Sequence, residues 1–310
     1  MASLVFHVIS SAGLFSYGLY HLVLATKAHL KSPSNPPASK PYHPLPASSS
    51  ASHFIKHLPL YLLLLSLSLA VLQQSILSTL SDPLYRIHRI SSLQSLASLL
   101  FFLLLALSLL LPNFPLLHIP RLPPDLFFAL ASAAFAIHSS VARASTAAFA
   151  AQSFHLQSKC DAVSFKISAA ASALCAALAF DLRLFVAELA LAASFCLQGL
   201  WVLQTGLSLY ADGFIPEGCH RLLDVVRGVE GSTECDLEDS QVRAVAILDL
   251  VFIFYLVFVA VIVLVVYASV VRASGMQRVG SYEALPTVAA APGVVNSNHV
   301  QMKAMTNTQE

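Results

Sequence analysis

Charged residues are scarce in this chain, and their scarcity argues against a soluble fold. Only 11% of the 310 residues are Asp, Glu, Lys or Arg, whereas soluble domains average about a quarter. The 17 basic and 16 acidic residues leave a net charge of +1, without the clustered basic stripe that marks nucleic-acid binding. We therefore expect no nucleic-acid partner.

Several short metal-binding and modification motifs are also absent. The five cysteines form no Cys-x-x-Cys pair and no His-Glu-x-x-His sequence occurs, so the sequence predicts neither a metal site nor a cofactor. No Asn-x-Ser/Thr sequence occurs, which excludes N-linked glycosylation. Because no nucleophile–base signature is recognisable either, we expect that the protein is not an enzyme.

Apolar residues, in contrast, are abundant: they make up 57% of the chain, and the mean hydropathy is +0.73. A stretch of roughly 20 apolar residues in a helix crosses the hydrocarbon core of a bilayer. Seven stretches meet this requirement: Leu4–Ala25, Leu58–Leu80, Leu93–Leu111, Pro124–Val141, Ala162–Phe180, Leu184–Leu209 and Ala244–Val271. The sequence therefore predicts an all-α, polytopic bundle of about seven transmembrane helices in a lipid bilayer.

Two of these stretches allow a second interpretation. Leu4–Ala25 resembles a signal peptide in hydrophobicity, but no basic residue precedes it, so we assign it as the first spanning helix. Pro124–Val141 is short and Arg143 follows it closely. If this stretch did not span, six helices would remain and both termini would lie on one side.

Two segments are predicted to be disordered because proline and serine crowd them and apolar residues are few. One is residues 32–53, a loop inside the membrane domain 1–272, and the other is the C-terminal tail 273–310. In the tail, Tyr282 and Leu285 have the spacing of a tyrosine-based sorting signal. Such a signal requires a cytosolic tail.

The basic residues near the helix ends are balanced between the two sides, and only the first helix favours an orientation. No charge precedes it, and Lys27 and Lys31 follow it, which predicts an N-terminus outside the cytosol and a cytosolic C-terminus. The loop with Cys219 and Cys235 would then face an oxidising compartment, where the two form a disulfide. The alternative is two free thiols in a cytosolic loop.

Polar side chains inside spanning helices often mark functional sites, because burying them in lipid costs free energy. The candidates for ligand binding or for a pore lining are Glu188, Gln198, Trp201, Gln204, Asp249 and His138. A plainer interpretation of the middle of the sixth span is hydrogen bonding between helices. For the two carboxylates the plainer interpretation is a position near a helix N-terminus, where the helix dipole favours negative charge.

The sixth span also carries a resemblance to a known family. Its sequence from Leu197 to Gly206, LQGLWVLQTG, followed by Leu209 and Tyr210, is similar to the most recognisable stretch of the transmembrane protein 45 family, its plant branch in particular. His7, Gly13, Gly18 and His21 resemble the N-terminal pattern of that family. The resemblance extends over roughly Phe6–Tyr210 and implies a seven-helix membrane protein, without implying an activity.

The sequence favours a non-enzymatic protein of the endomembrane system or plasma membrane that binds lipid, a small ligand or membrane-protein partners. A transporter or channel that uses the polar residues of the last two spans is the first alternative. A membrane hydrolase that depends on histidines such as His138 is the second. The oligomeric state does not follow from the sequence.

Overall fold

The computed structural model describes residues 2–31, 37–45, 56–80, 86–111, 122–151, 154–221 and 233–274. All of them belong to one compact unit, Met1–Gly275. The predicted sorting signal at Tyr282 and Leu285 lies outside these residues, as does almost all of the tail 273–310.

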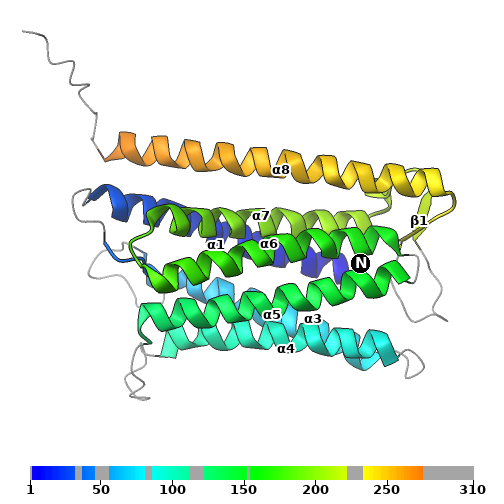
Figure 1. Cartoon of the computed structure of the whole chain (residues 1–310), viewed down its shortest axis with the longest axis horizontal. Helices are drawn as coiled ribbons and strands as arrows, with labels where there is room; N and C mark the ends of the chain where they lie inside the picture. Colours follow the sequence, from blue (N-terminus) through cyan, green and yellow to red (C-terminus); the bar gives the residue numbers. More distant parts are fainter. Residues whose placement is uncertain are drawn as a thin grey trace, which may run out of the picture. The chain divides into compact units, whose positions relative to one another are not determined.

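Seven helices of the described residues are long and apolar enough to cross a membrane, and Figure 1 shows them as a bundle. They are α1 Ala2–Lys31, α3 Leu58–Leu80, α4 Arg86–Leu110, α5 Pro124–Ala151, α6 His155–Phe180, α7 Phe185–Tyr210 and α8 Glu238–Ala273. The predicted all-α membrane bundle is confirmed. A short 3-10 helix, η2 Asp212–Phe214, and two short strands, β1 Cys219–Arg221 and β2 Thr233–Cys235, lie between α7 and α8.

The helix α5 removes the doubt about the fourth span. The sequence predicts a short helix that ends at Val141, but α5 has 28 residues and continues to Ala151. Arg143 lies on its exposed face, and small residues such as Ala144, Ala147 and Ala148 keep the last turns helical because Ala has the highest helix propensity. The fourth stretch is therefore long enough to span.

The helices pack as antiparallel neighbours, with α1 against α7 and α5 against α6 as the two most extensive pairs. The connection from α6 to α7 is tight because the backbone N–H of Arg183 donates to Asp181 Oδ1 at 2.9 Å. By contrast, α8 lies along one side of the bundle, against α1, α6 and α7. Only 6% of its spanning stretch is buried inside the protein, against 39% for α7, so α8 is the helix most exposed to lipid.

Small residues bring α1 and α7 close together. Ala192, Gly199 and Gly206 recur every seven residues along α7, which places them on one face. A Cβ added at Gly199 would lie 2.8 Å from the backbone nitrogen of Phe15, and one at Gly18 would lie 2.7 Å from that of Cys196. Close backbone approach through small residues is a common way for helices to associate in lipid. The lipid tails are as apolar as the side chains, so the hydrophobic effect does not drive the helices together.

The strands β1 and β2 pair antiparallel, with Cys219 opposite Cys235, and a disulfide joins these two cysteines. The residues just before β1 contact the start of α8, since the guanidinium of Arg243 donates to the carbonyl of Glu217 at 2.8 Å. Gly218 has a φ of 81°, a conformation that glycine adopts without strain. The hairpin therefore covers the end of the bundle where α7 finishes and α8 begins.

Residues 37–45 are the described part of the Ser/Pro-rich segment between α1 and α3. They belong to the segment 32–53 that composition predicts to be disordered, yet they lie against α1 and the start of α7. The backbone N–H of Ser39 donates to the carbonyl of Leu182 at 2.6 Å, and the hydroxyls of Tyr17 and Tyr20 donate to the carbonyls of Pro41 and His43. The composition of the segment cannot predict these contacts, because other parts of the chain supply the hydrogen-bonding partners.

Candidate ligand cavity

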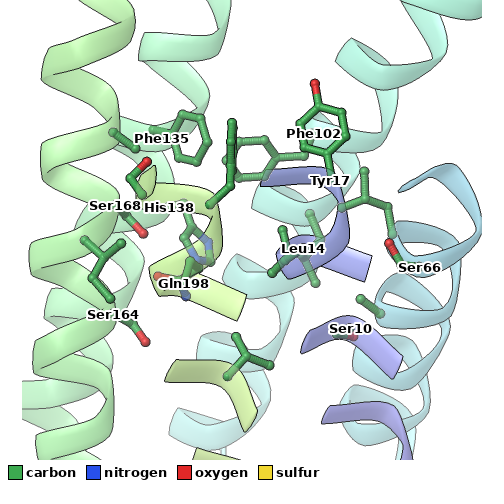
Figure 2. Close-up of a pocket in the computed structure, with 18 of the residues that line it drawn as sticks. Ser10, Leu14, Tyr17, Ser66, Phe102, Phe135, His138, Ser164, Ser168 and Gln198 are labelled. Atoms are coloured by element: carbon green, nitrogen blue, oxygen red, sulfur yellow. The ribbon is translucent and has the colours of Figure 1, made fainter. Parts of the chain in front are cut away.

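The bundle contains a cavity of about 440 Å³, which Figure 2 shows in close-up. Residues of α1, α3, α4, α5, α6 and α7 line it, and α8 contributes none of the lining residues. Its volume is in the range of small-molecule sites, about 300–1,000 Å³. The wall of this cavity is therefore formed without α8.

The cavity is polar at one end and apolar at the other. Alternating helix directions place the end of α3, the end of α5 and the start of α6 on one side of the membrane. Gln157, Asp161, Ser145, Gln73 and Gln74 line the cavity there. Asp161 is held in place, because Ser145 Oγ donates to its Oδ2 at 2.6 Å and Gln157 Nε2 donates to its Oδ1 at 3.2 Å.

At the opposite end, aromatic and aliphatic side chains form most of the wall. These are Phe127 and Phe128 of α5 and Leu105 and Leu109 of α4. Two polar side chains, His21 and Tyr17 of α1, also line the cavity toward this end. The gradient from carboxylate and amides to phenylalanines suits an elongated amphipathic molecule.

Gln198 of α7 lies midway along the cavity wall, together with His138 of α5 (Figure 2). The side-chain oxygen of Gln198 is buried and has no hydrogen-bond partner among the described residues. An unpaired buried acceptor costs about 1–3 kcal/mol, a cost that a ligand hydroxyl or a water molecule would remove. Among the candidate residues that line this cavity, Gln198 therefore has the clearest structural signature of ligand binding.

His138 also faces the cavity, but the protein already holds its ring. Ser98 Oγ lies 3.2 Å from His138 Nδ1, and the ring of Phe102 contacts it edge-on with centroids 5.8 Å apart. In the part of the chain that the structure describes, His138 belongs to no group of potential metal ligands. The arrangement gives the hydrolase hypothesis no metal centre at His138.

Trp201 and Gln204 lie away from the cavity. Trp201 is completely buried, donates from Nε1 to the carbonyl of Cys160 at 2.9 Å, and packs edge-on against Phe252 of α8. Gln204 accepts from the hydroxyl of Tyr255 on α8 at 2.9 Å. Both residues connect α7 to its neighbouring helices, as the plainer interpretation of this span supposes.

Asp249 likewise connects two helices. Its carboxylate lies 2.7 Å from Lys159 Nζ, so the pair links α8 to the start of α6. The side chain of Asp249 is half exposed, and Asp249 does not line the cavity. An ion pair that joins two helices accounts for this residue.

Glu188, the remaining candidate, lies in the first turn of α7 and is 6% exposed. Its Oε2 accepts from Ser39 Oγ at 2.7 Å, and its Oε1 faces the side chains of His21 and His43. The sequence alone does not connect these residues, because His21, His43 and Glu188 come from three distant segments. The one available signal was that His21 and Glu188 are polar and lie inside apolar helices.

Seven helices that are long and apolar enough to span a bilayer, six of which line a shared cavity, define a multi-pass membrane protein. Residues 124–268 match the model of a family of unknown function, DUF716. The match confirms the resemblance to transmembrane protein 45 and includes the stretch Leu197–Gly206. It starts later than the resemblance does and extends past Tyr210 into α8. No curated protein is similar enough to count as a match.

Proposed function

We propose that this protein binds an amphipathic small molecule, of the size of a lipid or lipid fragment, in the cavity between α1 and α3–α7. The proposal rests on the buried side-chain oxygen of Gln198, which has no hydrogen-bond partner in the described part of the chain and lies in the wall of a largely apolar cavity. The polar group of the ligand would lie toward Gln157 and Asp161, and its apolar part toward Phe127 and Phe128. Binding of this kind requires no catalytic group, in keeping with a non-enzymatic role.

Native mass spectrometry of the protein in mild detergent tests this proposal. We expect the wild-type chain to retain a small molecule, and we expect Gln198→Leu to retain it about five- to tenfold less, because the loss of one hydrogen bond to a ligand costs about 1 kcal/mol or somewhat more. Ser168→Phe, which introduces a ring into the cavity wall, should abolish retention. Phe254→Ala, at a 62% exposed position of α8, is the matched control and should bind as the wild type does.

A wild-type chain without any retained molecule, and without binding of added lipid, would contradict the proposal. Transport is the second candidate, because residues from near both ends of the spanning helices, such as His21 and Gln157, line the same cavity. Flux of the retained molecule across proteoliposomes, lost in Gln198→Leu, would favour transport over binding alone.

We also propose a cellular membrane and an orientation for this protein. We place the protein in the endomembrane system or plasma membrane, with its C-terminus in the cytosol and the β1–β2 hairpin in an oxidising compartment. The Cys219–Cys235 disulfide supports this orientation, because disulfides persist in such compartments and are rare in the cytosol. Lys27 and Lys31 at the end of α1 point to the same orientation.

Thiol counting tests the orientation. Cys160, Cys175 and Cys196 are free and buried. We therefore expect a maleimide reagent to label these three thiols in the denatured, unreduced protein from cells and all five cysteines after reduction. Labelling of five thiols without reductant would place the hairpin in a reducing compartment and reverse the orientation.

A further inference from the structure

Three potential metal ligands from distant segments converge near the end of α1. His21 belongs to the second half of α1, Glu188 to the first turn of α7, and His43 to the segment 37–45. One ligand atom of each lies within 4.8 Å of the others. The side chains of His21 and Glu188 are only 5% and 8% exposed.

The His43–Glu188 distance in this cluster is close to that between two ligands of one ion, whereas the His21 ring nitrogen would have to move a few tenths of an ångström closer. His43 Nε2 lies 3.5 Å and His21 Nε2 lies 3.9 Å from Glu188 Oε1, whereas N–H···O bonds span about 2.7–3.2 Å. Tetrahedral zinc bonds of about 2.0–2.1 Å place neighbouring ligand atoms about 3.4 Å apart. His43 Nε2 and Glu188 Oε1 are both buried without a hydrogen-bond partner among the described residues, and one cation would satisfy both.

The surroundings orient the ligand atoms. Ser39 Oγ donates to Glu188 Oε2, which leaves Oε1 directed at the two histidines. The hydroxyl of Tyr20 donates to the backbone carbonyl of His43, and the backbone N–H of Ser39 donates to the carbonyl of Leu182. Hydrogen bonds of this kind, which fix the ligands of a metal from behind, are typical of metal sites in proteins.

We infer that His21, His43 and Glu188 bind one divalent transition-metal ion of the zinc type. Two imidazoles and one carboxylate suit zinc, whereas calcium and magnesium prefer oxygen ligands alone. A small cavity of about 110 Å³ borders His43, Glu188 and Ser39, which leaves room for water in a fourth position. The ion would fasten the segment 37–45 to α1 and α7.

Metal analysis of the full-length protein tests the inference. After removal of metal by a chelator and addition of Zn²⁺, we expect the wild-type chain to take up one equivalent in the manner of a single site. We expect His43→Ala and Glu188→Gln each to weaken Zn²⁺ binding about 100-fold or more, since each removes a direct ligand. Ser39→Ala should weaken binding about 10- to 100-fold, the usual effect of losing a hydrogen bond behind a ligand.

His155→Ala is the matched control, because it removes a partly buried histidine at the start of α6 that is outside the cluster. Its Zn²⁺ affinity should equal that of the wild type. Size-exclusion profiles and melting temperatures establish that each variant is folded. Hydrogen exchange offers a second measurement on the unmutated chain: Zn²⁺ should slow exchange of the Ser39 amide relative to the chelated protein.

Two results would overturn the inference. One is a folded wild-type chain that binds Zn²⁺ no better than His43→Ala does. The other is Zn²⁺ binding that His155→Ala weakens as much as His43→Ala, since the bound ion would then lie elsewhere. A protein that retains its amphipathic ligand but binds no Zn²⁺ would remove the metal site and leave the proposed function intact.

Discussion

Trp201→Ala is expected to lower the free energy of unfolding by about 3–5 kcal/mol, the usual cost of truncating a fully buried tryptophan. Trp201 has no exposed surface and packs among residues of α6, α7 and α8. The lost stability comes from packing contacts, because exposing apolar surface of α7 to lipid tails costs little free energy. Chemical or thermal unfolding in detergent measures it.

Two further variants separate packing from hydrogen bonding at this position. Trp201→Phe keeps most of the ring volume but removes the donor to the carbonyl of Cys160, and should cost about 1–2 kcal/mol. Phe254→Ala truncates an aromatic side chain at a position 62% exposed on α8 and should change stability by less than about 0.5 kcal/mol. Equal losses for Trp201→Ala and Phe254→Ala would refute the assigned packing role.

The second large effect is expected at the contact between α1 and α7. Gly18→Ala and Gly199→Ala should each destabilise the protein by about 1–3 kcal/mol, the cost of overfilling a packed site. At both positions the added Cβ would meet backbone atoms at 2.7 or 2.8 Å. Backbone cannot rotate aside as a side chain can, so the two helices must separate.

Gly213→Ala is the control for these two variants. A Cβ at Gly213 would meet nothing within 4 Å, and its stability should match that of the wild type. If Gly18→Ala and Gly199→Ala melted at the wild-type temperature as well, the close approach of α1 and α7 would not be a feature of the folded protein.

Hydropathy predicts the spanning helices well because a bilayer imposes length and composition on every helix that crosses it. It predicts helix ends less well, as α5 shows by continuing ten residues beyond Val141. Most of those residues are alanine, which forms helix readily, although Arg143, Ser145 and Thr146 are too polar to be counted in an apolar stretch. Apolarity defines the part of a helix inside the hydrocarbon, whereas helix propensity and packing decide where the helix ends.

The cavity is only partly predictable, because its wall depends on how each helix is rotated. Spacing places Gln198, Trp201 and Thr205 on one broad face of α7. The residues that line the cavity are Gln198, Val202 and Thr205, and at about 100° per residue Trp201 lies about 60° away from Gln198. That rotation directs Trp201 toward α6 and α8. No pattern in a single helix reveals which neighbour it will meet.

The cluster of His21, His43 and Glu188 cannot be predicted from the sequence either, for a different reason. Metal-site motifs are recognisable when ligands are close in the sequence, but these three residues are joined by packing alone. His43 lies in a segment whose composition predicts disorder, and its position depends on hydroxyls of α1 and on Glu188 of α7. Composition describes what a segment can do by itself and omits what its neighbours supply.

The pairing of the first spanning helix with the sixth has a consequence for biosynthesis. Helices enter the membrane in chain order, so α1 must wait in the bilayer until α7 arrives before its most extensive interface can form. Until then, Gly18 and the buried side chains of Ser11, His21 and Thr26 lack their final partner. In a chain interrupted before α7, α1 therefore lacks the helix against which it packs most extensively. A membrane chaperone or quality-control protease is able to recognise the exposed face.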